Sequence, residues 1–246
     1  MRTLAGCALL MATTAGFAEP TAQGTQQPRL INGRLETHVV SAGLAKDLPA
    51  LARTLTEPAW IGYAMPMIDG NHHMCDDWSD GRRATFSTAP VHLEAPGYFL
   101  VLFRIEDRQV ARVRTYSADC PLDASGKTVH WFTTVTAADS LAYLTATVSG
   151  PSSSSRIVDS AVTAIAMHAG QPALDRLVSL ARNHDRSKVR SSALFWLAQR
   201  AGEKAAGTIT DAIENDPDTD VKKRAVFALS QLPKDEGVPL LIQQAR

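Results

Sequence analysis

The 246-residue sequence has no excess of charge of either sign, because 25 lysines and arginines balance 25 aspartates and glutamates. This balance, together with the lack of a contiguous basic patch, argues against nucleic acid as a partner. After residue 18 the sequence also lacks an apolar run long enough to cross a bilayer, so we expect no membrane span.

Motifs for common catalytic chemistry are missing as well. The sequence has no Gly-x-Ser-x-Gly segment to present a nucleophilic serine, and no glycine-rich loop to hold a phosphate. His168 and His184 fall at the ends of predicted helices, where surface or capping histidines are common. We therefore predict no catalytic residue, no cofactor and no enzymatic activity.

What the sequence does contain is a repeat over residues 155–246. Apolar residues recur every 32 positions, as at Ile157, Val189 and Val221. Within each copy the apolar residues have the spacing of one helix face, and a second apolar segment follows. One helix pair is too small to bury its own apolar face, so successive pairs must stack to complete a core. The repeat predicts an all-α solenoid of three two-helix units.

Residues suited to helix ends mark the boundaries within each unit. Gly170 and Gly202 suit the left-handed residue that follows a helix. The second helices are predicted at 174–181, 206–213 and 238–245, which places Pro239 in a first turn, where it needs no N–H partner. A hydroxyl residue able to cap a helix precedes each first helix: Ser155, Ser187 and Thr219.

The two best-defined first helices carry a family resemblance. The segments Asp216-Pro-Asp-Thr-Asp-Val-Lys-Lys-Arg-Ala-Val-Phe-Ala-Leu and Ser191-Ser-Ala-Leu-Phe-Trp-Leu-Ala-Gln resemble short bacterial HEAT repeats, of the type also seen in phycobilisome-lyase-like proteins. The resemblance implies a HEAT-like solenoid that binds an unidentified partner protein. It implies no lyase activity, because no chromophore-handling residues can be matched. The sequence stops without a polar capping unit, so we expect a fragment of a longer array or a partner over that end.

Phe195 and Phe227 occupy one column of the repeat, away from the face of each helix that is predicted to be buried. One interpretation is an apolar stripe that binds a partner protein. The other is packing against an adjacent helix pair or the N-terminal domain. Trp196 aligns with Ala164 and Ala228 and is predicted to lie in the core.

The N-terminus has the features of an export signal at residues 1–18. Met1-Arg2 is positive, Leu4 to Phe17 is apolar and small, and Gly16-Phe-Ala18 fits a small-x-small cleavage site. Leu4-Ala-Gly-Cys7 also matches a lipobox, although almost no apolar segment precedes it. Residues 19–29 predict a flexible leader. We expect a periplasmic or extracellular protein.

Residues 30–149 lack the repeat and predict an α+β domain, with a Ser-rich linker at 150–154. A helix is expected to begin at Leu44 and another at Thr136, where Asp139 completes a capping box. Strands mixed with helices at the edges predict a sandwich. The strands are expected at 33–40, 59–68, 98–105, 110–116 and 129–135.

Three segments of this domain resemble the N-terminal part of a group of secreted bacterial HEAT proteins with no established activity. They are Trp60-Ile-Gly-Tyr-Ala-Met-Pro-Met, His72-His-Met-Cys75 and Ser117-Ala-Asp-Cys120. The resemblance supports the two-part architecture and implies no chemistry.

Cys75 and Cys120 are the two cysteines outside the predicted signal. An even number of cysteines in an exported chain predicts a disulfide. The alternative is a metal-dependent sensor or enzyme in which His72, His73, Cys75 and Cys120 bind zinc, with His130 as a more distant candidate. The lack of a Cys-x-x-Cys motif disfavours a redox dithiol.

Overall fold

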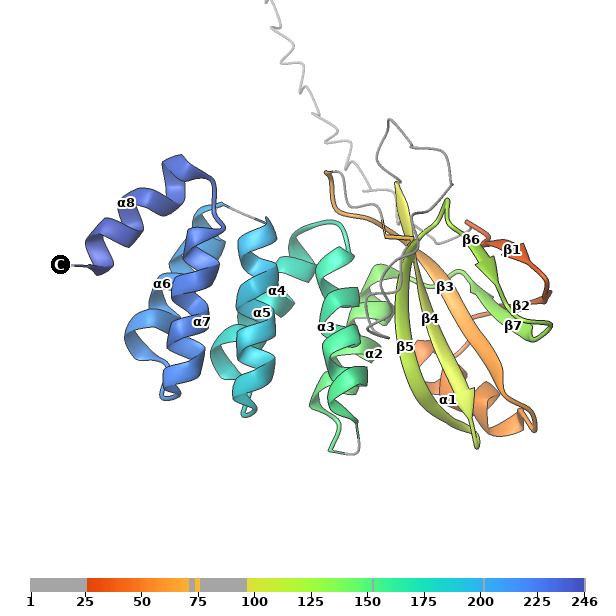
Figure 1. Cartoon of the computed structure of the whole chain (residues 1–246). Helices are drawn as coiled ribbons and strands as arrows, with labels where there is room; N and C mark the ends of the chain where they lie inside the picture. The colour runs from red at the N-terminus through yellow and green to blue at the C-terminus, as the bar shows by residue number, and fades with distance from the viewer. Residues whose placement is uncertain (1–25, 71–73, 76–96, 152, 201, 246) are drawn as a thin grey trace, which may run out of the picture.

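The computed structural model describes residues 26–70, 74–75, 97–151, 153–200 and 202–245. A strand-rich N-terminal part is followed by consecutive helices that extend away from it in a row (Figure 1). This arrangement confirms the predicted fold class, an α+β part followed by a HEAT-like α-solenoid. No helix in the described ranges is both long and apolar enough for a membrane span.

The N-terminal part is built on a five-stranded mixed sheet of order β2-β7-β3-β4-β5. The strands are β2 (Arg34–Val39), β7 (Thr128–Thr133), β3 (Ala59–Pro66), β4 (Tyr98–Glu106) and β5 (Gln109–Ser117). β2 and β3 both run parallel to β7, whereas β3, β4 and β5 pair antiparallel. Two short parallel strands, β1 (Arg29–Ile31) and β6 (Pro121–Asp123), form a second sheet. The strand positions agree with the sequence prediction, but neither short strand beside the main sheet nor any parallel pairing was predicted.

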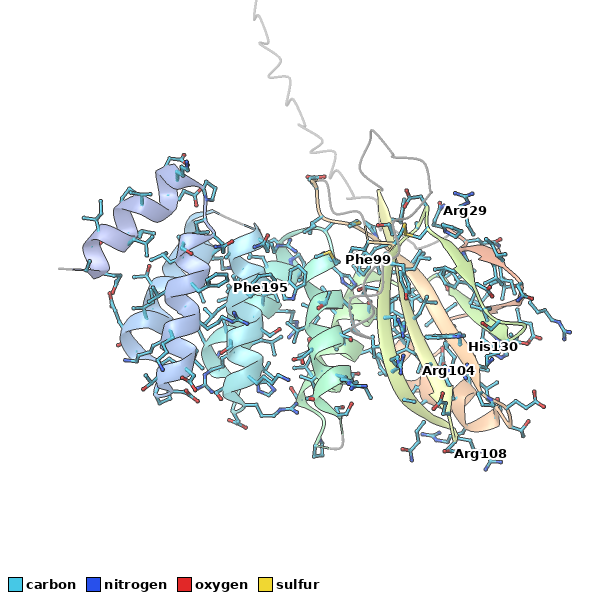
Figure 2. All side chains as sticks on the ribbon, in the orientation of Figure 1. Arg29, Phe99, Arg104, Arg108, His130 and Phe195 are labelled. Atoms are coloured by element: carbon cyan, nitrogen blue, oxygen red, sulfur yellow. A yellow bond between two sulfur atoms is a disulfide. The ribbon has the colours of Figure 1, made fainter. Side chains whose placement is uncertain are left out.

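The hairpin β4–β5 follows directly from its sequence. The apolar run at 98–105 and the alternating apolar residues at 110–116 predict two paired strands, and the structure confirms them. Asp107 and Arg108 form the turn with φ of 49° and 63°, the left-handed values that a tight hairpin turn requires. Arg108 marks the tip of the hairpin in Figure 2.

Each face of the sheet has its own apolar core. Ile61, Tyr63 and Met65 alternate along β3 on the face that packs against helices. The opposite face carries Leu102 and Trp131, which pack with residues of β1 and β6. The helices near the first face are α1 (Leu44–Thr54), α2 (Ala137–Ser149) and α3 (Ser155–Met167). At the start of α2, the Thr136 hydroxyl accepts a hydrogen bond from the Asp139 N–H at 3.1 Å, as the capping box predicts.

The solenoid consists of stacked helix pairs. Its first helices, α3, α5 (Ser187–Arg200) and α7 (Thr219–Ser230), stand side by side in Figure 1. Its second helices are α4 (Gln171–Asn183), α6 (Glu203–Asn215) and α8 (Lys234–Gln244). One repeat column is alanine in every unit and completely buried, which lets neighbouring helices approach closely: Ala161, Ala193 and Ala225.

Several helix ends differ from the prediction, and α4 and α6 begin three residues earlier than expected, at Gln171 and Glu203. The side chains that cap α3 and α7 belong to Ser154 and Asp218, so the predicted hydroxyl column lies one residue inside each helix. Helix α8 begins at Lys234 and not at residue 238, because Pro233 adopts the non-helical conformation of a residue preceding a helix. Pro239 therefore lies in the interior of α8 and not in its first turn.

The sheet and the solenoid share one apolar core. Helix α3 packs against both α2 and β5, and the buried apolar cluster runs from α1 to Leu232 without a break. Two backbone hydrogen bonds join the end of β3 to the end of α3. The Ile68 N–H donates to the Met167 carbonyl at 2.9 Å, and the Ala169 N–H donates to the Pro66 carbonyl at 3.0 Å. The predicted linker at 150–154 falls between α2 and α3, and the core continues past it.

Candidate functional site

The outer surface of α7 exposes a large aromatic side chain. Phe227 is 46% exposed and Val226, next to it, is 42% exposed. The Arg224 guanidinium carbon lies 5.7 Å from the centre of the Phe227 ring, a distance at which a cation and a π face attract. We call Arg224, Val226 and Phe227 the α7 surface. An aromatic ring beside an arginine is the combination enriched where proteins bind one another.

Phe195, at the equivalent position on α5, has a different environment (Figure 2). It is half-buried, and its ring makes an edge-on contact with Trp196 at 5.3 Å between centroids. Trp196 is itself only half-buried, whereas Ala164 and Ala228 in the same column are completely buried. A position that encloses an alanine methyl cannot enclose a whole indole ring. Trp196 therefore packs against the core without being fully enclosed in it, and its ring contacts Phe195.

A groove between α6 and α8 has an acidic rim. Its volume is about 770 Å³, and none of its lining residues is a lysine or arginine. Two of the acidic residues lie in the first turn of α8, where negative charge is favoured by the helix dipole. The acidic residues are Asp211, Glu214, Asp235 and Glu236. The charge of the groove suits basic side chains in preference to acidic ones.

A buried ion pair joins successive repeats. The Arg190 guanidinium donates two hydrogen bonds to the Asp216 carboxylate, at 2.7 and 2.8 Å. It also donates to the His184 carbonyl at 2.8 Å, while the Asp216 carboxylate accepts from the Asp218 N–H at 2.9 Å. These hydrogen bonds hold the pKa of Asp216 below its usual value. The pair fixes the position of α5 relative to the loop that enters α7.

A chain of buried hydrogen bonds crosses the junction between sheet and solenoid. His168, the C-cap residue of α3, is 1% exposed, so it is the capping histidine of the two sequence-based interpretations and not the surface one. Its Nδ1–H donates to the Ala164 carbonyl at 2.7 Å. Its Nε2 then accepts from the Ser140 hydroxyl at 2.8 Å, and that hydroxyl accepts from the Tyr63 hydroxyl at 2.8 Å. β3, α2 and α3 each contribute one side chain to the chain of bonds.

The His168–Ser140 pair superficially looks like a catalytic dyad, but its environment is that of a structural contact. Burial lowers the pKa of His168 to about 4, and it raises the pKa of Tyr63. Both rings and Ser140 are almost fully buried, with the Phe99 ring 5.0 Å from the imidazole. A substrate has no access to a hydroxyl enclosed in this way, so the chain of bonds serves to join the two parts of the protein.

Cys75 and Cys120 form a disulfide in the structure, with a sulfur–sulfur distance of 2.01 Å. This fits the disulfide that the sequence predicts. His72 and His73, the other ligands of the alternative zinc site, lie outside the described residues. A cysteine binds zinc as a thiolate, and neither sulfur is a thiolate while the disulfide is intact.

We expect protein lacking residues 1–18 to show no free thiol before reduction and two after it. Titration under denaturing conditions with a thiol reagent, with and without prior reductant, measures both values. Two thiols in the unreduced protein, accompanied by zinc that is lost on changing His72 and His73 to alanine, would instead favour the metal alternative.

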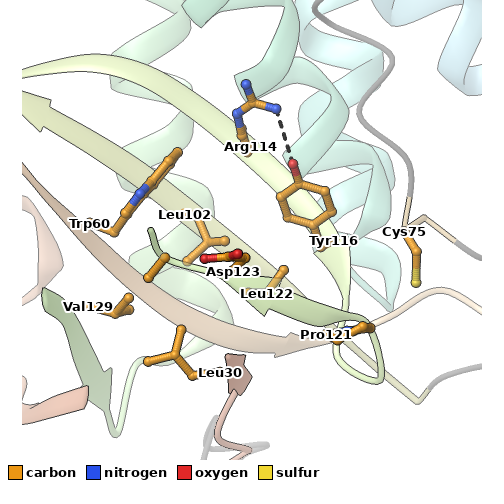
Figure 3. Close-up of a pocket in the computed structure, with 11 residues that line it drawn as sticks. Leu30, Trp60, Cys75, Leu102, Arg114, Tyr116, Pro121, Leu122, Asp123 and Val129 are labelled. Atoms are coloured by element: carbon orange, nitrogen blue, oxygen red, sulfur yellow. Dashed lines mark hydrogen bonds between the residues drawn. The ribbon is translucent and has the colours of Figure 1, made fainter. Parts of the chain in front are cut away.

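One small pocket lies on the sheet face that packs against β1 and β6 (Figure 3). Its volume is about 280 Å³. Trp60 and Leu102 form part of its wall, and Cys75 lies at one end. The Arg114 guanidinium reaches across to donate a hydrogen bond to the Tyr116 hydroxyl at 3.1 Å. The pocket lining is therefore mixed, with apolar side chains beside the polar groups of Arg114, Tyr116 and Asp123.

The fold defines a helical-repeat protein whose first repeat is joined to a mixed sheet. Residues 174–246 match a family model described as HEAT repeats. No curated protein matches the chain. The similarity covers α4 to α8 and agrees with the sequence resemblance, whereas the strand-rich part lies outside the match.

Proposed function

We propose that the chain is an exported, non-enzymatic scaffold that binds a partner protein through its HEAT-like solenoid. HEAT repeats are commonly protein-interaction scaffolds, and the matched residues contain the α7 surface. Export is proposed from the sequence features of residues 1–18. The division into residues 30–149, a linker at 150–154 and repeats over 155–246 is part of the same proposal.

The exposure of Phe227 is the observation on which this proposal depends. Burying a phenylalanine side chain is worth about 2 kcal/mol, and Phe227 leaves nearly half of its surface exposed to water. The cation–π contact with Arg224 favours one position of the ring before binding, which reduces the entropy lost on association. Of the two protein-binding residues predicted from the sequence, we therefore propose Phe227 as the contact residue. Phe195 packs on Trp196 of α5, the neighbouring helix.

We expect Phe227→Ser to abolish co-purification of the partner from cells that export the protein, with little change in melting temperature. Loss of binding follows because the side chain would form the centre of the interface, and stability is kept because the ring is exposed. Val39→Ser is the matched control, since Val39 is 68% exposed on strand β2, outside the solenoid. Quantitative mass spectrometry of the captured proteins gives the measurement.

Two further outcomes are informative. A large fall in melting temperature for Phe227→Ser would identify the ring as a packing residue and remove the observation behind the proposal. Retained binding by Phe227→Ser, with loss of binding by Asp211→Asn plus Glu214→Gln, would place the partner in the groove between α6 and α8. In that case the scaffold function would stand and the α7 surface would be the wrong contact site.

A further inference from the structure

Two histidines and a glutamate from two neighbouring strands meet at the edge of the sheet opposite the solenoid. His130 is on β7, and Figure 2 shows it in the part of the sheet away from the helical row. Glu36 and His38 are on β2, the edge strand that pairs with β7. β2 and β7 are parallel with Glu36 directly opposite His130. Because alternate residues of a strand share a face, the three side chains lie on one face of the sheet.

The ligand atoms of these side chains are already close together. His38 Nε2 lies 3.1 Å from His130 Nδ1, and His130 Nδ1 lies 3.4 Å from a Glu36 carboxylate oxygen. Each residue offers one donor atom, and the three atoms lie within 4.8 Å of one another. A tetrahedral zinc ion with bonds of 2.0 to 2.2 Å holds its ligand atoms about 3.3 Å apart. Both measured separations are close to that value.

We propose that Glu36, His38 and His130 bind a zinc ion, with the fourth coordination position open to solvent. Two imidazoles and one carboxylate are ligands of the kind that zinc takes. The site is nearly closed on the His130 side, where the imidazole is almost fully buried. It is open on the other side, because the Glu36 side chain is about half exposed. The open position would accept water or a donor group of another molecule.

The ligand set favours zinc over magnesium and calcium. Magnesium and calcium prefer ligand sets made entirely of oxygen, which two imidazoles cannot supply. The two imidazole rings also lie near each other, with 5.2 Å between their centroids and a tilt of 44°. The simpler alternative is a hydrogen bond between His38 and His130 with no metal function.

The test uses the full chain, purified without reductant, stripped of metal and dialysed against Zn²⁺. We expect one zinc ion per chain by elemental analysis, no binding of Mg²⁺ in the same assay, and a rise in melting temperature of roughly 5 °C at a hundredfold excess over Kd. His38→Gln and Glu36→Gln should each weaken zinc binding more than roughly tenfold, since even an outer-shell change costs that much. Both positions are at least partly exposed, so neither substitution should prevent folding.

The control is the double variant His72→Ala with His73→Ala, which removes the other pair of histidines. This variant should still bind one zinc ion per chain. Cobalt gives a second readout, because Co²⁺ bound by these ligands in place of Zn²⁺ should produce visible absorption that His38→Gln eliminates. The proposal is overturned if the wild-type chain binds no zinc, since His38 and His130 then form a hydrogen bond only. It is equally overturned if zinc is lost from the His72 and His73 variant but retained by His38→Gln.

Discussion

Replacing Asp216 with alanine should lower the free energy of unfolding by about 4 kcal/mol, the cost typical of breaking a buried ion pair. The substitution leaves the Arg190 guanidinium buried without its carboxylate, since both side chains are more than nine-tenths buried. It also removes the acceptor for the Asp218 N–H at the entrance to α7. Chemical denaturation followed by circular dichroism at 222 nm measures the change.

Asp175→Ala is the matched control for this prediction. Asp175 is also a solenoid aspartate paired with a basic side chain, Lys204, but the pair is exposed to solvent. Exposed pairs contribute little to stability, so the control should unfold almost like the wild type. An equal decrease in the free energy of unfolding for Asp175→Ala and Asp216→Ala would contradict the importance assigned to the Arg190–Asp216 pair.

The contribution of this pair also has a defined pH dependence. Arg190 keeps the pKa of Asp216 low in the folded state, so the unfolded chain takes up the proton first as the pH falls. The stabilisation is therefore fully present above the pKa of an unfolded aspartate, about 4, and is lost as the pH falls through the lower folded value. The difference between the wild type and Asp216→Ala should accordingly shrink under strongly acidic conditions.

His168 should make the protein less stable as the pH falls from 6.5 towards 4. The folded state holds the imidazole neutral, with a pKa of about 4, while an unfolded histidine takes up a proton near pH 6.5. Between these values the unfolded state binds more protons, so stability falls by up to about 1.4 kcal/mol for each pH unit. The positive charge of Arg200 also lowers the pKa of His168, because it opposes protonation of the imidazole.

The hydrogen-bond directions give the structural reason for this dependence. A protonated His168 would have to donate from Nε2 to the Ser140 oxygen, and the buried Ser140 hydroxyl would then lose the acceptor for its own hydrogen. Urea unfolding at pH 7, 6 and 5 should show a smaller pH dependence for His168→Gln than for the wild type. His184→Gln is the comparison, because His184 is half-exposed and should account for less of the slope. Parallel pH profiles for the wild type and His168→Gln would refute the role given to His168.

The helices and the hairpin could be predicted because their signals are local. The apolar run of β4, the alternation along β5 and the 3.6-residue spacing in each repeat all depend on neighbouring residues, so these elements were found. The pairing of β2 with β7 could not be predicted, because its partners are more than 90 residues apart and the pattern identifies a strand without naming its neighbour. The Glu36–His38–His130 group was missed for the same reason.

The buried polar groups were missed for a different reason. A histidine at a helix end is usually accessible, and only the docking of β3 and α2 encloses His168. Arg190 did leave a signal in the sequence, since the position one repeat earlier is the buried Val158. A charged residue in an apolar column requires a partner, and a search for a nearby carboxylate in the next loop would have led to Asp216.

The packing of α3 against the sheet has a consequence for how the number of repeats could have increased in evolution. Its inner side chains are fitted to β5 and α2, and its last turn carries the backbone bonds to β3. A copied α3 inserted farther along would bring Met167 and His168 to a place where no sheet receives them. Gene duplication would therefore extend the array most readily by copying the later units, which contact only other helices, while the unit beside the sheet stayed single.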